Sequence, residues 1–111
     1  MQTLPDTCAK QVTAYNTVAS GNTCGITLNA VAGNYHILDW LSWSYAADPT
    51  NGAITITDTT NNTVLMSVDV TAGGPGEFMF GDRGFPTLKA TALKVLMADG
   101  SQTKKLTIQY R

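Results

Sequence analysis

The chain has 111 residues, 43% of them hydrophobic, and a formal net charge of −1 at pH 7. This hydrophobic content excludes a disordered chain, the length suits one domain with its own core, and no apolar run is long enough to span a membrane. Nucleic acid is excluded as the main partner, because phosphate binding requires a basic stripe that the scattered lysines do not form. The start of the chain lacks a secretory signal pattern, so we expect synthesis in the cytoplasm.

Residues 1–20 have no clear hydrophobic period, and we interpret them as an N-terminal arm or an edge strand. As an arm, this segment would lie on a neighbouring subunit. We predict that residues 21–111 form one β-sandwich domain. Residues 23–30 alternate between apolar and polar side chains, with Cys24 and Ile26 on the same face, which predicts a strand at the start of that domain.

The longest predicted strand covers residues 35–45 and carries both tryptophans. Alternation places Trp43 on one face and Trp40 on the other, so both faces are largely apolar. Such a strand is central, or is covered on its second face by another chain or layer. A helical stripe also fits part of the segment, but the aromatic residues and the following Asp-Pro-Thr-Asn-Gly turn sequence favour a strand. Isoleucines then alternate with threonines, so we predict a β-hairpin over residues 35–58.

The middle of the chain continues with short strands and polar turns. Residues 59–62 form a turn in which Asn-Asn tolerates left-handed conformations, and a strand is predicted at residues 63–70. Residues 71–76 are rich in glycine and contain proline, which predicts an irregular segment without regular structure. A short strand is predicted at residues 77–80.

The C-terminal part contains the last two predicted strands. Residues 92–98 and 105–110 alternate, and Asp99-Gly100 between them is the strongest short hairpin signal of the chain. One helical turn is the only helix candidate, around residues 87–92. Seven or eight short strands with turn signals every eight to twelve residues predict an all-β fold, an antiparallel β-sandwich or jelly roll.

No catalytic, cofactor-binding or metal site is predicted from the residue pattern. His36 is the only histidine, so any triad would have to use it, but a packed or surface-capping role explains its position better. Asp39 lies among apolar residues, where we expect a hydrogen-bonded carboxylate. The other aspartates mostly flank turns and do not cluster as a calcium site requires. The glycines at 73–76 lack the lysine and the helix of a phosphate-binding loop.

The chain has two cysteines, Cys8 and Cys24. A disulfide between them would close a loop across the first segment. In a chain made in the cytoplasm thiols are more often free, and a buried cysteine then acts as a small hydrophobic residue. Two cysteines without closely spaced partners do not make a zinc site.

The aromatic set Tyr35, Trp40, Trp43 and Tyr45 has two interpretations. Aromatic side chains on a β-sandwich face stack on sugar rings in many carbohydrate-binding modules. Large aromatic residues are also what protein interfaces and cores bury. Because the two tryptophans lie on opposite faces of one strand, one of them is expected to contact another subunit, a loop or a ligand. We favour a subunit interface over a sugar.

The order of several motifs is familiar. A strand that ends in Trp-Ser-Tyr, from Gly33 to Tyr45, precedes Gly-Ala-Ile-Thr-Ile-Thr-Asp and Val-Asp-Val-Thr-Ala-Gly-Gly-Pro-Gly. Phe-x-x-x-x-Arg-Gly from Phe78 to Gly84, an Ala-Leu-x-Val strand and a final Leu-Thr-Ile-Gln-Tyr follow. Over residues 24–111 this order resembles the small β-sandwich structural proteins of tailed bacteriophages, of the head decoration or cement type.

The resemblance implies a virion protein that binds the major capsid protein and its own copies, commonly as a trimer, and stabilises the head. It implies no reaction and no cofactor. Arg83, flanked by glycine on one side, is expected to make a polar contact with the capsid or a neighbour. A carbohydrate- or receptor-binding module remains the alternative. The candidate interface residues are Tyr35, Trp40, Trp43, Phe78, Phe80, Arg83 and Phe85.

Overall fold

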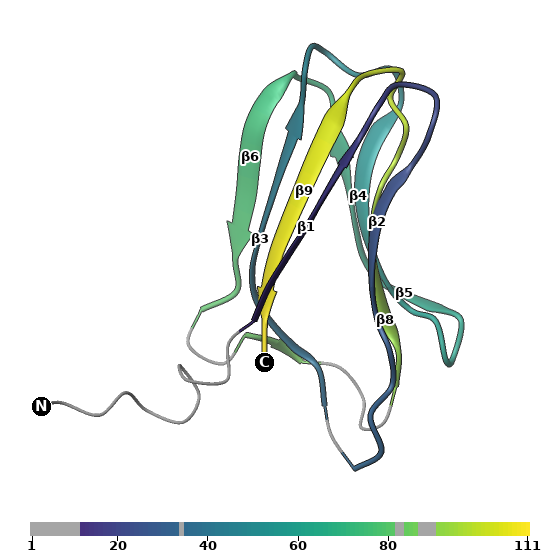
Figure 1. The fold of residues 1–111 in the computed structure, drawn as a ribbon, viewed down its shortest axis with the longest axis vertical. Coiled ribbons are helices and arrows are strands. Elements are labelled where there is room, and N and C mark those ends of the chain that lie inside the picture. The colour runs from purple at the N-terminus through teal and green to yellow at the C-terminus, as the bar shows by residue number, and fades with distance from the viewer. Residues whose placement is uncertain (1–11, 34, 82–83, 87–90) are drawn as a thin grey trace, which may run out of the picture.

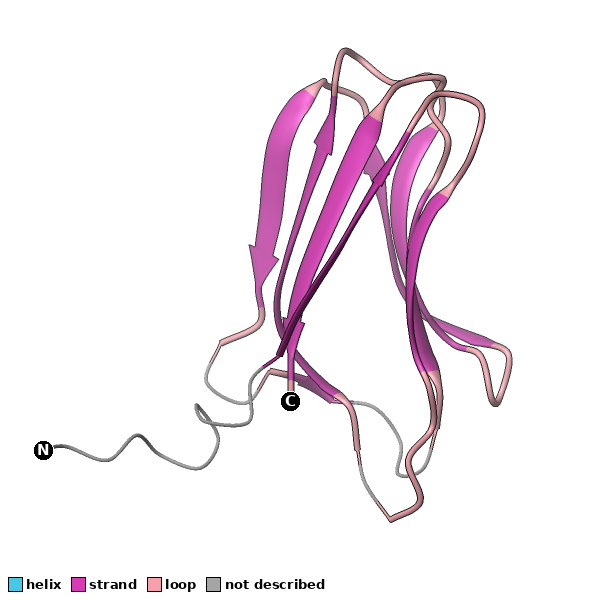
Figure 2. Ribbon diagram, viewed as in Figure 1, coloured by secondary structure: helices cyan, strands magenta, loops and turns pink. Residues whose placement is uncertain are grey.

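The structure, a computed structural model, describes residues 12–33, 35–81, 84–86 and 91–111. These residues form an antiparallel β-sandwich (Figure 1). Within these ranges it contains strands and loops and no helix (Figure 2). The predicted all-β sandwich is therefore confirmed. The strands are β1 (Val12–Val18), β2 (Cys24–Leu28), β3 (Ile37–Tyr45), β4 (Gly52–Asp58), β5 (Thr63–Val70), β6 (Gly74–Met79), β7 (Phe85–Pro86), β8 (Leu93–Met97) and β9 (Lys104–Tyr110).

Two sheets face each other across the core. Sheet A has the order β1-β9-β3-β6, with the two-residue strand β7 also paired to β3. Sheet B has the order β2-β8-β4-β5. Every pairing is antiparallel. Among the described strands, only β4 and β5 form a hairpin between consecutive strands of the same sheet (Figure 1).

The core is built by strict alternation along the central strands. In β8, Leu93, Val95 and Met97 are fully buried while the residues between them are half-buried, as the apolar periodicity predicts. Ile54 and Ile56 of β4 are buried on the same side of sheet B. Burying each such side chain contributes about 1.5–3 kcal/mol, so these strands account for much of the stability.

Within the described strands, register shifts interrupt the alternation in β5, between Val64 and Met66, and inside β3. Leu38 and Leu41 are both fully buried although they are three residues apart. The register with β9 shifts between Leu38 and Trp40, so Asp39 is an extra residue, as in a β-bulge. The predicted alternation of residues 35–45 placed Leu38 and Trp40 on the same face. This was wrong, because the bulge at Asp39 puts Leu38 on the opposite face from Trp40. A bulge supplies no strong sequence signal, because it depends on the partner strand.

The predicted hairpin over residues 35–58 was wrong. β3 belongs to sheet A and β4 to sheet B, so the loop 46–51 crosses between the sheets. The local turn chemistry is as expected, since Asn51 has a φ of 54°. A turn sequence does not specify whether the strand after it pairs with the strand before it or joins the opposite sheet.

The hairpin predicted at Asp99-Gly100 was wrong for the same reason. Gly100 and Ser101 have positive φ, 60° and 58°, whereas a two-residue turn centred on Asp99-Gly100 would place positive φ at Asp99 and Gly100, so the turn lies one residue later than predicted. However, β8 lies in sheet B and β9 in sheet A, so the turn connects the two layers. The sequence thus identified a turn near Asp99-Gly100, but it did not identify the strands that pair with β8 and β9.

The irregular segment predicted at residues 71–76 was also partly wrong, since β6 begins at Gly74. Pro75 lies opposite Ser44 of β3, and β6 is the last strand of the sheet A order. Proline removes a donor, which an edge strand tolerates on its open side. A Cβ at Gly76 would lie 2.4 Å from the ring of Trp43, so glycine leaves room for that ring.

One end of the sandwich is closed by a buried lysine that the sequence pattern did not reveal. The side chain of Lys104 is fully buried, and its Nζ donates to the carbonyl oxygens of Ala19 and Asn22 at 3.1 and 2.6 Å. It also contacts Asp99 Oδ1 at 3.1 Å. The same carboxylate oxygen accepts a hydrogen bond from Gly21 N at 2.8 Å. The lysine thus connects the β1–β2 turn to the β8–β9 turn.

The N-terminal segment is only partly described. β1 is the edge strand of sheet A next to β9, and residues 1–11 lie outside the described residues. The division of the chain at residue 20 stays a prediction. Most of the helical turn predicted around residues 87–92 also lies outside, as residues 87–90 are not described. No helix in the described part of the chain is long and apolar enough to cross a membrane.

Candidate functional site: the outer face of sheet A

The four aromatic residues Trp43, Phe78, Phe80 and Phe85 of the predicted interface set lie on the inner side of the sandwich. All are half-buried and pack against the hydrophobic core. Their rings form a continuous row, with centroid distances of 5.1 Å between Trp43 and Phe78, 6.4 Å between Phe78 and Phe80, and 5.2 Å between Phe80 and Phe85. These spacings suit tilted aromatic packing. The structure gives these residues a role in the core, and a subunit contact for them stays untested.

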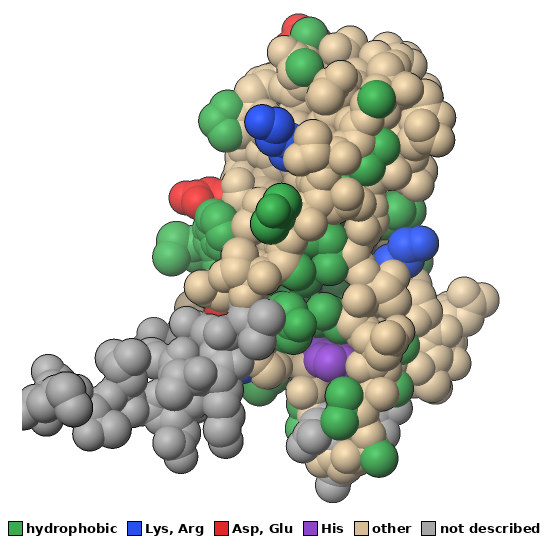
Figure 3. Space-filling view, in the orientation of Figure 1, with side chains coloured by type: hydrophobic (Ala, Val, Ile, Leu, Met, Phe, Trp, Pro, Cys, Tyr) green, Lys and Arg blue, Asp and Glu red, His purple; other side chains and the backbone are tan. Residues whose placement is uncertain are grey.

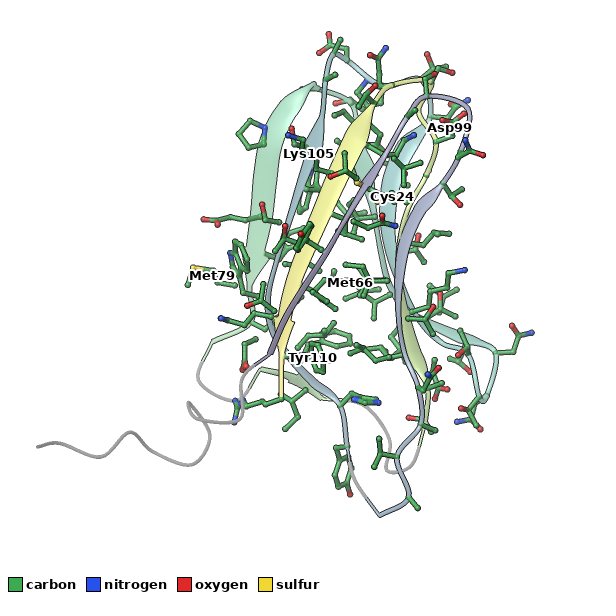
Figure 4. The ribbon with its side chains drawn as sticks, in the orientation of Figure 1. Cys24, Met66, Met79, Asp99, Lys105 and Tyr110 are labelled. Atoms are coloured by element: carbon green, nitrogen blue, oxygen red, sulfur yellow. The ribbon has the colours of Figure 1, made fainter. Side chains whose placement is uncertain are left out.

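Trp40 points to the opposite side of sheet A, away from sheet B. Its strand partners there are Gln109 of β9 and Met79 of β6. Figure 4 shows Met79 and Lys105 on this outer side, whereas Met66 and Cys24 lie between the sheets. One tryptophan therefore packs in the core and the other does not, as the opposite faces of the strand predicted.

This outer face of sheet A combines two strongly exposed apolar residues with hydroxyl and amide groups. Tyr15 is 79% exposed and Met79 is 76% exposed. In Figure 3 an acidic side chain lies beside apolar ones along the left margin, on the outer side of β6 and β3. The paired registers place these residues on the outer face: Thr13, Tyr15 and Thr17 of β1; Lys105, Thr107 and Gln109 of β9; Trp40, Ser42 and Ser44 of β3; and Pro75, Glu77 and Met79 of β6.

The orientation of the Trp40 ring is set by a neighbouring strand. Trp40 Nε1 donates a hydrogen bond of 2.9 Å to Glu77 Oε2. Glu77 lies opposite Ser42, diagonal to Trp40, so the bond directs the indole across the sheet surface. A ring that is held in one orientation loses less conformational entropy when a partner covers it.

The other predicted interface residues do not join this face. Tyr35 is 54% exposed and lies before β3, outside the paired strands. Arg83 lies outside the described residues, so its predicted polar contact is untested. The residues that the prediction missed are Tyr15, Met79, Glu77 and Lys105. Outward positions on β1 and β6 depend on which strands pair with β9 and β3, and only the topology supplies this.

His36 and Asp39 have the structural roles expected for them. His36 Nε2 lies 2.6 Å from the carbonyl oxygen of Asn29, and its ring is T-shaped to Tyr110 at 6.3 Å. Asp39 Oδ1 accepts from Arg111 Nε at 2.9 Å, and both side chains are mostly buried. The expected packed histidine and hydrogen-bonded carboxylate are both observed.

Cys24 is a free thiol in the core, and Cys8 lies outside the described residues. Burial raises the pKa of the Cys24 thiol, which disfavours the reactive thiolate. Across the described ranges, no three metal-ligating side chains come together. A pocket of about 280 Å³ lies between the 46–51 loop and β5, with Asp69 as its single charged residue.

Two carboxylates are held ionised by hydrogen bonds. The pKa of Asp58 is lowered from its ordinary value of 3.8, first by the side chain of Asn61 and then by its backbone N–H. The pKa of Asp99 is lowered from the same value, first by its hydrogen bond with Lys104 and then by that with the backbone of Gly21. Both groups therefore hold their protons less strongly in the folded chain than in the unfolded chain.

We expect the melting temperature to fall in acid because of these two groups. A lowered folded-state pKa gives stability that is present above the unfolded value, here 3.8, and is lost as the pH falls through the folded value. Thermal unfolding measured from pH 7 downward should show a constant melting temperature until about pH 4 and a decline below it. Asp58→Asn should make this decline shallower, and an unchanged acid decline would contradict the assignment.

Comparison with known proteins assigns no family. No known sequence family matches the chain, and no curated protein matches it. Among solved structures, it is similar to a fucose-binding module of Streptococcus pneumoniae, at 13% identity and a TM-score of 0.49, over 89% of this chain and 70% of that one. PirA has 13% identity and a TM-score of 0.48, over 89% of this chain and 93% of the other. A disulfide-linked pilus protein of Bacillus endospore appendages has 15% identity and a TM-score of 0.42, over 91% and 84% of the respective chains.

At these sequence identities and TM-scores, the ligands and assemblies of the similar proteins cannot be assigned to this chain. The assignment of the β-sandwich rests on the chain's own two sheets. The similarity to bacteriophage decoration proteins stays a prediction from the sequence motifs.

Proposed function

We propose that this chain is a non-enzymatic structural protein of a virion, which stabilises the head by binding the capsid surface and neighbouring subunits. The observation that carries the proposal is the outer face of sheet A, where Met79 is exposed beside an oriented Trp40 and Tyr15 is exposed two strands away. Exposed apolar residues grouped on one face of a sheet mark an interaction surface. The motif order over residues 24–111 supports the virion assignment.

The composition of this face suits a protein partner. It contains three apolar residues, Tyr15, Pro75 and Met79, together with one tryptophan, one cation and one anion among uncharged side chains, which resembles the aromatic centre and polar rim of an interface. A nucleic acid would require several cations on this face, and the registers place only Lys105 there. The proposed partners are the major capsid protein and further copies of the chain, on the virion surface.

Trp40→Ala should weaken capsid binding at least tenfold, because a central interface tryptophan is typically a binding hot spot. The measurement is co-sedimentation of the purified chain with empty heads assembled from the major capsid protein encoded in the same genome. Val64→Ala is the matched control, since Val64 is an exposed apolar residue of β5 in sheet B. No co-sedimentation of the unchanged chain would refute the proposed function.

A carbohydrate-binding module is the second candidate, and one observation favours it. The Trp40 ring is fixed by Glu77, and the hydroxyl groups of Ser42 and Thr107 lie in the next row of the same face. An aromatic platform beside polar groups can stack on a sugar ring and bond its hydroxyls. A glycan screen read by tryptophan fluorescence would detect such binding, and the signal should disappear in Trp40→Ala while Trp43 still fluoresces.

A further inference from the structure

The outer face of sheet A contains two pairs of side chains with the same spacing. In the paired register, Trp40 lies two strands across and two residues along from Tyr15. Glu77 lies two strands across and two residues along, in the same direction, from Lys105. With about 4.8 Å between strands and about 3.4 Å per residue, the Cα atoms of each pair are roughly 12 Å apart.

This arrangement is self-complementary. The line from Tyr15 to Trp40 is parallel to the line from Lys105 to Glu77. With these spacings between strands and residues, one straight line in the plane of the sheet bisects both at right angles, and it runs diagonally across β9 and β3. A two-fold axis along that line exchanges the members of both pairs at once. When two copies meet face to face, Tyr15 of each copy then lies against Trp40 of the other, and Lys105 lies against Glu77.

We propose that the outer face of sheet A binds a second copy of this chain about this two-fold axis. The inference deepens the proposed function, because it names the neighbouring subunit that the face contacts. Each contact occurs twice in the dimer, as an isologous interface requires. The strands of the two copies would cross at roughly 70°, which is close to the orthogonal class of sheet packing.

The chemistry of the contacts fits this occupant. Tyr15, 79% exposed in one copy, would be covered by an indole that its bond to Glu77 already orients. Lys105 is the only cation and Glu77 the only anion that the registers place on this face. The two-fold axis brings each next to its opposite and keeps like charges apart. Charges placed in this way select the orientation of the contact more than they raise its affinity.

The size of the face predicts a weak dimer. Four strands of about seven residues cover roughly 19 by 23 Å, which places the buried area at the low end of specific interfaces. We therefore expect a dimer at high concentration that dissociates on dilution. The trimer that the sequence resemblance implies would need a different, head-to-tail contact.

The test is sedimentation velocity of the purified chain over a dilution series, together with charge variants. The unchanged chain should approach twice the monomer mass at its highest soluble concentration. Lys105→Glu or Glu77→Lys should each weaken the dimer about tenfold, because two attractive pairs become repulsive. The double variant should bind clearly more tightly than Glu77→Lys alone, because it restores both attractive pairs. The comparison of the double variant with Glu77→Lys is the informative one. Both variants lack the Glu77 carboxylate that accepts from Trp40 Nε1, so they differ only at residue 105.

Lys94→Glu is the control. It reverses the same kind of charge, but Lys94 lies on β8 in sheet B and not on the proposed interface. It should leave the dimer unchanged, and circular dichroism should show every variant folded. A monomer at all concentrations, a trimer mass, or no rescue in the double variant would overturn the inference. If a strict monomer still binds capsids through Trp40, the proposed function stands and this inference falls. A dimer that binds no capsid would support this inference and refute the proposed function.

Discussion

Lys104→Ala is expected to lower the free energy of unfolding by about 2–3 kcal/mol, because it removes the hydrogen bonds of a buried charged group. The lysine is fully buried, and the carbonyl oxygens of Ala19 and Asn22 both accept from its Nζ. Alanine would remove these bonds and leave a cavity under the two turns. Urea unfolding followed by circular dichroism measures the change.

The adjacent residue offers a matched control for this prediction. Lys105 has the same side chain, but it is exposed on the outer face of sheet A. Lys105→Ala should change the stability by less than about 0.5 kcal/mol. Lys104→Met is informative as a second variant, since methionine fills the volume and supplies no donors. If Lys104→Ala and Lys105→Ala unfold at the same urea concentration, the proposed role of the buried contacts is wrong.

Trp43→Ala is expected to destabilise the fold by about 3 kcal/mol, near the lower end of the range for tryptophan-to-alanine changes in cores because the side chain is half-buried. Its ring covers Gly76 and contacts Phe78 at a centroid distance of 5.1 Å. Removing it would open a cavity at the start of the aromatic row. Guanidinium unfolding monitored by circular dichroism would measure the loss without relying on tryptophan emission.

Trp40→Ala is the natural comparison, since the same change is made three residues away on the other face of β3. Trp40 is also half-buried and donates to Glu77, but no layer of sheet B lies over it, so the variant should lose only about 1 kcal/mol. The two variants thus separate the two tryptophans: one should affect stability and the other binding. Equal destabilisation by both would show that Trp40 is also part of a core.

This separation bears on the function. A tryptophan that can be removed with little loss of stability is available for a role other than folding. The same holds for Tyr15 and Met79, whose exposed fractions of 79% and 76% leave their apolar surface in water. Both the proposed capsid contact and the two-fold dimer would cover this surface. Glycan binding would use it as well, and the fluorescence titration distinguishes that case.

The sequence determined the type of fold and most of the core. Alternation along residues 93–97 and 54–56 identified strands whose buried residues are those expected, because a half-buried strand must repeat every two residues. The positive φ at Asn51 and Gly100 was likewise predictable from turn chemistry. The opposite faces of Trp40 and Trp43 also followed from their odd separation, since both lie beyond the bulge at Asp39.

Only the tertiary structure decided which strands pair. Local turn sequences do not specify whether the chain returns to the same sheet or crosses to the other, so both hairpins predicted around residues 35–58 and Asp99-Gly100 proved to be crossings. The burial of Lys104 depends on carbonyl oxygens far away in the sequence, at Ala19 and Asn22. The candidate site depends on pairing in the same way, because β1, β9, β3 and β6 come from four separate parts of the chain, and their order alone places Tyr15, Trp40, Glu77 and Lys105 on one face.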